Sequence, residues 1–275
     1  MIEKKKRRPI ITLTTDFGTK DSYVASMKGV IVSINPEADI IDVTHEITAG
    51  AIKEAAYLID ECRHFFPEAT IHLAVVDPGV GGERRPLVVE AGGQVFVGPD
   101  NGIFWPAIDS DPAALIYHLD NPSYFLASVS STFHGRDIFA PAAAHISMGV
   151  KPASMGTAVS EPVRLAIKAP AVEEGILKGE VTRVDHFGNI ITNLRREQIE
   201  DAFKDGELPV VKIGGIVLKG FSRTYMDVPE GAATCLIGSS GFLEIVVNRG
   251  RASDLLGKEG TGPIGSICEI SKASR

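Results

Sequence analysis

The most informative part of this sequence is Val75-Val76-Asp77-Pro78-Gly79-Val80-Gly81-Gly82-Glu83-Arg84-Arg85. The apolar, β-branched run at residues 71–76 predicts a short buried strand, and Asp77 stands at its end. Three glycines in four positions remove side-chain bulk from the following loop, so its backbone can approach a ligand closely. Arg84, at the far end of the loop, can fold back toward Asp77. An isolated turn of this type is usually a surface turn with an Asp–Arg pair, so its interpretation depends on the neighbouring loops.

Alternating strand and helix patterns surround this stretch. Residues 9–15 and 38–43 are apolar and β-branched, whereas apolar side chains recur at helical spacing in residues 22–34 and 52–62. This alternation predicts right-handed crossovers and a mostly parallel sheet that is covered on both faces. Ligands of such sheets bind beyond the carboxyl ends of the strands. Because Asp16 and Asp77 both follow strand ends, we expect them in one site.

The chain changes character from Gly179 onward, after the remaining elements of the first domain. A hairpin at residues 86–97, a strand at 114–119 and an alanine-rich helix ending near His145 are followed by a proline-marked stretch. From Gly179 onward, short β-rich runs are interrupted by one helix at 195–203, which is typical of a small barrel or sandwich. We therefore predict an N-terminal α/β domain with a central, mostly parallel sheet (1–165), a linker (166–178) and a smaller C-terminal all-β, barrel-like domain (179–275).

The composition argues against several classes of protein. The chain has 275 residues, of which 44% are hydrophobic, enough for a full core. A net charge of −7 argues against nucleic-acid binding, and the basic run Lys4–Arg8 is more typical of a solvated terminus. No apolar run approaches the ~20 residues that span a bilayer, so no membrane partner is expected. The odd number and wide spacing of Cys62, Cys235 and Cys268 indicate buried thiols in a reducing cytoplasm.

Chemically active side chains gather in the predicted strand-end loops. They are Asp16, Asp21, Asp77, Arg84 and His134, and a second group lies in Asp185-His186-Phe187-Gly188-Asn189. Each residue also has a structural explanation, because aspartates cap helices, Asp and Asn form turns, and loop histidines bond to backbone.

Familiar catalytic and metal motifs are missing from the sequence. It contains no phosphate-binding GxxxxGK[ST] loop and no GxSxG elbow, and Pro86 begins a strand where a dinucleotide motif needs a helix. Asp42, His45, Asp77, His134 and Asp137 match no established metal-ligand spacing, so we expect structural histidines and no metal.

Six motifs together resemble the S-adenosylmethionine hydroxide adenosyltransferases, the water-using relatives of the fluorinases and chlorinases. The resemblance extends from about Ile10 to Ile270, with the motifs in the expected order. They are Thr14-Thr15-Asp16-Phe17-Gly18, Asp42-Val43-Thr44-His45, Val76-Asp77-Pro78-Gly79-Val80-Gly81, Gly98-Pro99-Asp100-Asn101-Gly102, Thr132-Phe133-His134-Gly135-Arg136-Asp137 and Asp185-His186-Phe187-Gly188-Asn189.

The resemblance implies an activity and an assembly. S-adenosyl-L-methionine and water would give adenosine and L-methionine without a cofactor. The enzyme would be a homotrimer, with each site between the α/β domain of one subunit and the β domain of its neighbour.

The resemblance also implies roles for individual residues. Asp77, Arg84 and His134 match the catalytic triad that holds and activates water. Asp16 matches the ligand of both ribose hydroxyls, while Asp21 and Asp185 match the pair on the methionine ammonium. The remaining predicted substrate contacts are Phe187 and Asn189 at the adenosyl end, Phe221 beside the adenine, and Ser239 at the carboxylate. The chain departs from the fluorinase pattern at Ser240, where an arginine is expected, so the second carboxylate contact stays open.

Elementary chemistry agrees with this activity but leaves rival functions. A sulfonium leaves as a neutral thioether, so the reaction lacks only a placed and activated nucleophile, which Asp77, Arg84 and His134 can supply. A halide-using enzyme is the nearest rival, although a carboxylate would repel the halide. A non-catalytic adenosine- or S-adenosylmethionine-binding module is the second rival, and a metal-dependent hydrolase is the third.

Overall fold

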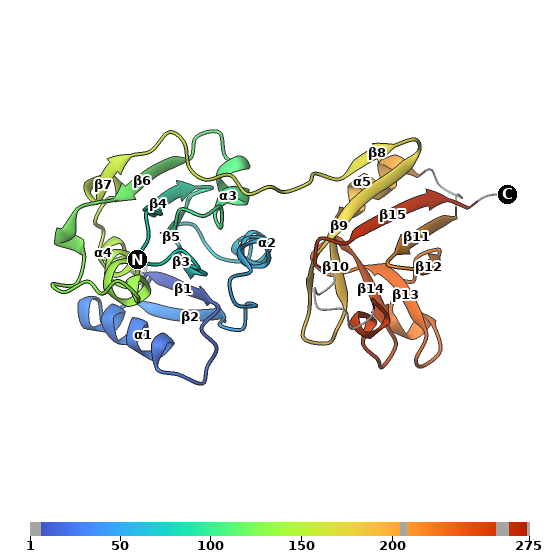
Figure 1. Cartoon of the computed structure of the whole chain (residues 1–275), viewed down its shortest axis with the longest axis horizontal. Helices are drawn as coiled ribbons and strands as arrows, with labels where there is room; N and C mark the ends of the chain where they lie inside the picture. Colours follow the sequence, from blue (N-terminus) through green and yellow to red (C-terminus); the bar gives the residue numbers. More distant parts are fainter. Residues whose placement is uncertain (1–6, 204–207, 257–263, 274–275) are drawn as a thin grey trace, which may run out of the picture. The chain divides into compact units, whose positions relative to one another are not determined.

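The computed structural model describes residues 7–203, 208–256 and 264–273, and it divides into two compact units (Figure 1). The units are Met1–Leu165 and Ala166–Arg275. Residues 4–6 of the basic run lie outside the described part of the chain.

The first unit is built on a mixed β-sheet. Its strands follow the order β2 (Asp39–Thr44), β1 (Ile10–Thr15), β3 (Ile71–Val75), β5 (Gln94–Pro99), β4 (Pro86–Ala91), β6 (Leu115–Leu119) and β7 (Gly156–Ala158). The first four strands of this order run parallel, and the remaining pairs are antiparallel. The hairpin turn at Gly92-Gly93, with φ of 57° and 73°, reverses the chain between β4 and β5 and so starts the antiparallel half. The α/β class is thus confirmed, and the parallel part of the sheet comprises β2, β1, β3 and β5.

Helices cover both faces of this sheet. On one face, buried side chains of α1 (Tyr23–Ile34) and α4 (Ala140–Ser147) share a core with β1 and β3. On the other face, α2 (Ile52–Arg63) and α3 (Trp105–Asp109) share a second core with Phe96, Leu87 and Val89. One turn of π-helix, Gly135–Phe139, leads into α4.

The second unit is a barrel-like sheet. Its strand order is β12 (Ile216–Lys219), β11 (Pro209–Ile213), β15 (Ile267–Lys272), β9 (Ile176–Val184), β10 (Ile190–Arg195), β14 (Phe242–Val247) and β13 (Ala233–Ile237). The end strands β12 and β13 contact each other, which brings the sheet close to closure. A continuous apolar core fills its interior, and α5 (Arg196–Ala202) packs at its side through Ile199. The predicted barrel-like all-β fold is confirmed.

Short elements complete the chain. Part of the predicted linker is a strand, β8 (Ala171–Glu173), which pairs with β9. Short 3-10 helices occur at Pro122–Tyr124, Pro152–Ser154, Tyr225–Asp227 and Ala252–Leu256. Within the described residues, no helix has the length and apolar character needed to cross a membrane.

Candidate active site

Asp77, Arg84 and His134 meet at the carboxyl edge of the sheet. Arg84 Nε donates to both carboxylate oxygens of Asp77, each at 3.0 Å, and Arg84 Nη2 donates to Asp77 Oδ2 at 2.5 Å. The same Nη2 lies 2.7 Å from His134 Nδ1. The side chains of Asp77 and Arg84 are only 5% and 10% exposed, and the guanidinium packs over the ring of Phe139. The arginine thus joins a carboxylate to an imidazole in a nearly dry environment.

The contact with Arg84 determines which nitrogen of His134 carries the proton. A guanidinium has donors only, so Nδ1 of His134 must accept, and the neutral ring then carries its proton on Nε2. Burial lowers the pKa of His134, and the charge of Arg84 lowers it further against a smaller opposing effect of Asp77. His134 is therefore neutral near pH 7, with its proton on Nε2.

A close backbone approach brings the loops of Arg84 and His134 together. Gly81 has φ of 76°, and a Cβ at this position would lie 2.2 Å from the carbonyl oxygen of Ser131. Only glycine accommodates both conditions without strain. The glycines of the Asp77 loop therefore serve loop packing as well as ligand access.

Asp16 lies at the same edge as Asp77. The register pairs Thr15 at the end of β1 with Val75 at the end of β3, so the residues that follow both strands are neighbours. Asp16 Oδ2 accepts a hydrogen bond from the amide of Gly50 at 2.8 Å. A Cβ on Gly50 would lie 3.9 Å from Pro78, directly after Asp77. The structure thus brings Asp16 close to the triad.

Asp21 is exposed just before α1 and does not cap it. The N-cap residue is Ser22, and its side chain makes no capping hydrogen bond. An aromatic cluster connects this region to the triad: the ring centroids of Phe17 and Tyr23 lie 6.0 and 5.2 Å from that of Phe133, which precedes His134. This cluster was not predicted, although each of its rings adjoins a polar motif in the sequence.

In the second unit, Asp185 and Asn189 form one turn between β9 and β10. The carboxylate of Asp185 accepts from the backbone amide of Asn189 at 2.8 Å and from its side-chain amide at 2.9 Å. Phe187 at the tip is 71% exposed. The turn thus holds a fixed carboxylate beside an exposed ring.

Phe221 and Ser239 lie elsewhere in this unit. Phe221 follows β12 and is half-exposed, while Ser239 is exposed in the turn between β13 and β14. The Asp185 turn adjoins the other end of β14, because Ile190 pairs with Ile245. Side chains nevertheless link the two loops: a Cβ on Gly238, next to Ser239, would meet the carboxylate of Glu244, and the charges of both Glu244 and Asp185 raise the pKa of Tyr225.

Tyr225 is a further residue near Asp185 that the sequence did not single out. Burial raises the pKa of its hydroxyl, and the charges of Glu244 and Asp185 raise it further. It begins a short 3-10 helix, whose capping sequence Thr224-x-x-Asp227 is the one local signal of an ordered element there.

Two of the five residues considered as metal ligands, Asp42 and His45, contact each other and Thr15. His45 Nδ1 lies 2.9 Å from the hydroxyl of Thr15, and Nε2 lies 3.1 Å from Asp42. Across residues 7–203, 208–256 and 264–273, no group of three or more His, Cys, Asp or Glu side chains is arranged to hold a metal ion.

Comparison with known proteins identifies the family. The models of the S-adenosylmethionine hydroxide adenosyltransferase N-terminal and C-terminal domains match residues 11–156 and 179–264. A protein of Thermus thermophilus named (R)-S-adenosyl-L-methionine hydrolase is 41% identical over 262 residues, covering 92% of this chain and 97% of the relative. A fluorinase of an Actinoplanes species is 31% identical over 273 residues, covering 82% and 92%.

A solved structure agrees with these matches. An uncharacterised conserved protein of Thermotoga maritima superimposes with a TM-score of 0.88 at 36% identity, covering 95% of this chain and 99% of that one. With both family models matched across most of its length, the chain belongs to the S-adenosylmethionine hydroxide adenosyltransferase family.

Proposed function

We propose that the protein hydrolyses S-adenosyl-L-methionine by in-line attack of water on the ribose C5′, giving adenosine and L-methionine. The 41% identical relative carries the name of such a hydrolase, which supports this activity. The observation in this chain that carries the proposal is the contact of Asp77, Arg84 and His134 through a single guanidinium.

The chemistry explains why such a trio suffices. The oxygen of water forms a bond to C5′ while the C5′–sulfur bond breaks. The electron pair of the broken bond stays on sulfur and neutralises the sulfonium. The leaving group is then a neutral thioether, so we propose that no general acid, metal or cofactor takes part. One proton must leave the water, and the water must be aligned behind C5′; alignment alone contributes about 7–11 kcal/mol in the best model systems.

We assign the proton to Asp77. Nδ1 of His134 is engaged by Arg84 and Nε2 carries a hydrogen, so His134 serves as a donor that orients the water oxygen. Asp77 Oδ1 accepts one bond from Arg84 and retains capacity for the water proton. Arg84 stabilises the hydroxide-like charge that develops.

The remaining side chains are proposed to bind substrate. Asp16, held in orientation by Gly50, would accept from the ribose hydroxyls, and Asp21 and Asp185 would bind the ammonium. Phe187, Asn189 and Phe221 would surround the adenosyl group, and Ser239 would contact the carboxylate.

Hydrolysis in ¹⁸O-labelled water tests the reaction. The label should appear in the 5′-hydroxyl of adenosine, and Asp77→Ala, Arg84→Ala and His134→Ala should each lower kcat ~10²-fold or more with smaller effects on KM. Label in another product, or wild-type turnover in all three variants, would refute the mechanism.

The same assay separates the rival functions. A chlorinated nucleoside in the presence of chloride would identify a halide-using enzyme, which the carboxylate of Asp77 opposes. Substrate binding without turnover would identify a binding module. Loss of activity after treatment with a chelator would identify a metal-dependent enzyme.

We also propose a homotrimer whose sites lie between subunits. The proposed catalytic residues belong to the first unit, while several proposed substrate contacts belong to the second. Asp77→Ala and Asp185→Ala subunits, each inactive alone, can be mixed in equal amounts. If they associate at random, about one quarter of the sites should combine an intact Asp77 with an intact Asp185 and regain activity. No regained activity, or a monomer in analytical ultracentrifugation, would contradict this assembly.

A cytoplasmic location is proposed as well. Cys62, Cys235 and Cys268 are all free thiols, which are typical of a reducing compartment. Cys235 and Cys268 are buried as predicted, whereas Cys62 is only half-buried. Cell fractionation tests the location.

A further inference from the structure

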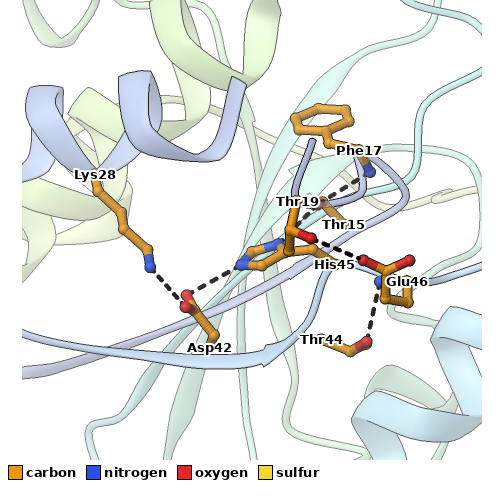
Figure 2. A network of polar contacts seen from close by, with 8 residues as sticks. All are labelled: Thr15, Phe17, Thr19, Lys28, Asp42, Thr44, His45 and Glu46. Atoms are coloured by element: carbon orange, nitrogen blue, oxygen red, sulfur yellow. Dashed lines mark hydrogen bonds and ion pairs between the residues drawn. The ribbon is translucent and has the colours of Figure 1, made fainter. Parts of the chain in front are cut away.

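The loop that carries Asp16 rests on a chain of polar side chains from three elements (Figure 2). Lys28 of α1 donates to Asp42 of β2 at 2.6 Å. Asp42 Oδ1 lies 3.1 Å from His45 Nε2, a charge contact that falls outside hydrogen-bond geometry. His45 Nδ1 lies 2.9 Å from the hydroxyl of Thr15, the residue before Asp16. This polar chain leads from the surface to the buried base of the loop.

The donors in this chain can be ordered in one direction only while His45 is neutral. The carboxylate of Asp42 lies beside Nε2 of His45 and cannot donate, so the hydrogen of the neutral ring is favoured on Nε2, and Nδ1 accepts from the hydroxyl of Thr15. The oxygen of Thr15 is then free to accept from the amide of Phe17, which lies 3.3 Å away. Asp42 therefore selects the histidine tautomer that orients Thr15 toward the loop.

Backbone contacts from the same segment complete the support. The amide of Gly18 donates to the carbonyl oxygen of His45 at 2.7 Å, and the amide of Gly50 donates to Asp16 itself at 2.8 Å. His45 is 5% exposed and Thr15 is fully buried, so neither is placed to touch a ligand. Their contacts can affect binding only by holding Asp16 and its loop.

We propose that His45, oriented by Asp42, is a positioning residue for substrate: through Thr15 and Gly18 it holds the Asp16 loop in the conformation that binds the ribose hydroxyls. This inference rests on the proposed function for its ligand. Its structural part, the support of the loop by His45, is independent of the ligand.

The chain offers a matched control for the test. Thr12, three residues earlier on β1, is also buried, and its hydroxyl lies 2.9 Å from Nδ1 of another buried histidine, His72. Thr12→Val and Thr15→Val therefore remove the same kind of bond from the same strand. Only Thr15 lies under the Asp16 loop, so the comparison separates positioning from general stability.

Two measurements on the full-length protein decide the question. Thr15→Val and His45→Phe should raise KM for S-adenosyl-L-methionine about 10-fold with kcat within about 3-fold of wild type, as expected for losing one supporting hydrogen bond. Amide hydrogen exchange at Phe17 and Gly18 should accelerate in both variants. Thr12→Val should change neither KM nor the exchange rate. Thr15→Ser keeps the hydroxyl, so its KM and exchange rate should be those of wild type.

Unchanged KM and exchange in Thr15→Val, or equal changes in Thr12→Val, would overturn the proposal. If wild-type protein neither bound nor hydrolysed S-adenosyl-L-methionine, the proposed function would fail. The exchange comparison would still decide whether His45 supports the loop.

Discussion

Replacing Arg84 by methionine should disconnect the candidate triad while preserving much of the side chain's bulk. Arg84 bonds to both of the other side chains: its guanidinium donates to the carboxylate of Asp77 and to the ring of His134. Without it, Asp77 is left unpaired at 5% exposure, and nothing holds Nδ1 of His134 as an acceptor.

The size of the effect follows from these contacts. Leaving a buried charge without its partner costs about 3–5 kcal/mol of the free energy of unfolding. Losing a preorganised donor at the developing charge lowers kcat by about 10²–10³-fold. The pKa of His134 should also rise, because the charge of Arg84 lowers it and the opposing charge of Asp77 would remain. Since neutral His134 is the proposed active form, the residual activity of Arg84→Met should disappear at a higher pH than that of wild type as the solution is acidified.

Arg85→Met is the control, because Arg85 pairs with Asp100, which is 3% exposed, in the same way but outside the triad. It should lower the melting temperature less, because Arg85 is 36% exposed and Asp100 keeps the hydrogen bond from the amide of Val163, and it should leave kcat nearly unchanged. Steady-state kinetics from pH 5 to 9, together with thermal unfolding, measures both quantities. Equal losses of kcat in the two variants would refute the role given to Arg84. The role would also be refuted if Arg84→Met lost its activity at a lower pH than wild type on acidification.

Three further predictions concern stability, loop packing and binding. Burial lowers the pKa of His72 to about 4, so only the unfolded chain takes up its proton between pH 6.5 and 4, and stability falls as the pH decreases through this range. Over this range His72 lowers the free energy of unfolding by about 3 kcal/mol. His72→Leu should therefore flatten the dependence of the free energy of unfolding on pH, measured by urea unfolding. An unaltered slope in the variant would contradict this prediction. Gly81→Ala should lower kcat about 10-fold, because its Cβ would meet Ser131 and displace the Arg84 loop; Gly149→Ala, with φ of 96° and open space around it, should leave kcat unchanged. Asp16→Ala should weaken adenosine binding at least about 10-fold in calorimetry, and an unchanged Kd would reject the ribose assignment.

Local pattern accounts for much of the fold. The predicted helices at 22–34 and 52–62 and the strand at 71–76 lie within one or two residues of α1, α2 and β3. Their apolar periodicity and end signals are carried by neighbouring residues, so no distant contact is needed to recognise them. The predicted hairpin at 86–97 is the antiparallel pair β4–β5, but the antiparallel pairing of β6 with β4 and with β7 was not predicted, because it depends on which distant strand is the partner. The strand β8 was likewise hidden, since it is three residues long and exists only by pairing with β9.

The order of residues was enough to predict that carboxylates follow β1 and β3 and that parallel strands would bring Asp16 and Asp77 to one edge. It also carried the six motifs by which the family was recognised. The folded chain was needed to see that Arg84 joins Asp77 to His134, which is 50 residues beyond Arg84 in the sequence. It was also needed to see that Thr15, His45 and Asp42 contact one another beneath the Asp16 loop. The physical reason is that hydrophobic periodicity encodes which face of an element is buried. The partner of a polar side chain depends instead on how separate loops pack, as with Gly81 against Ser131.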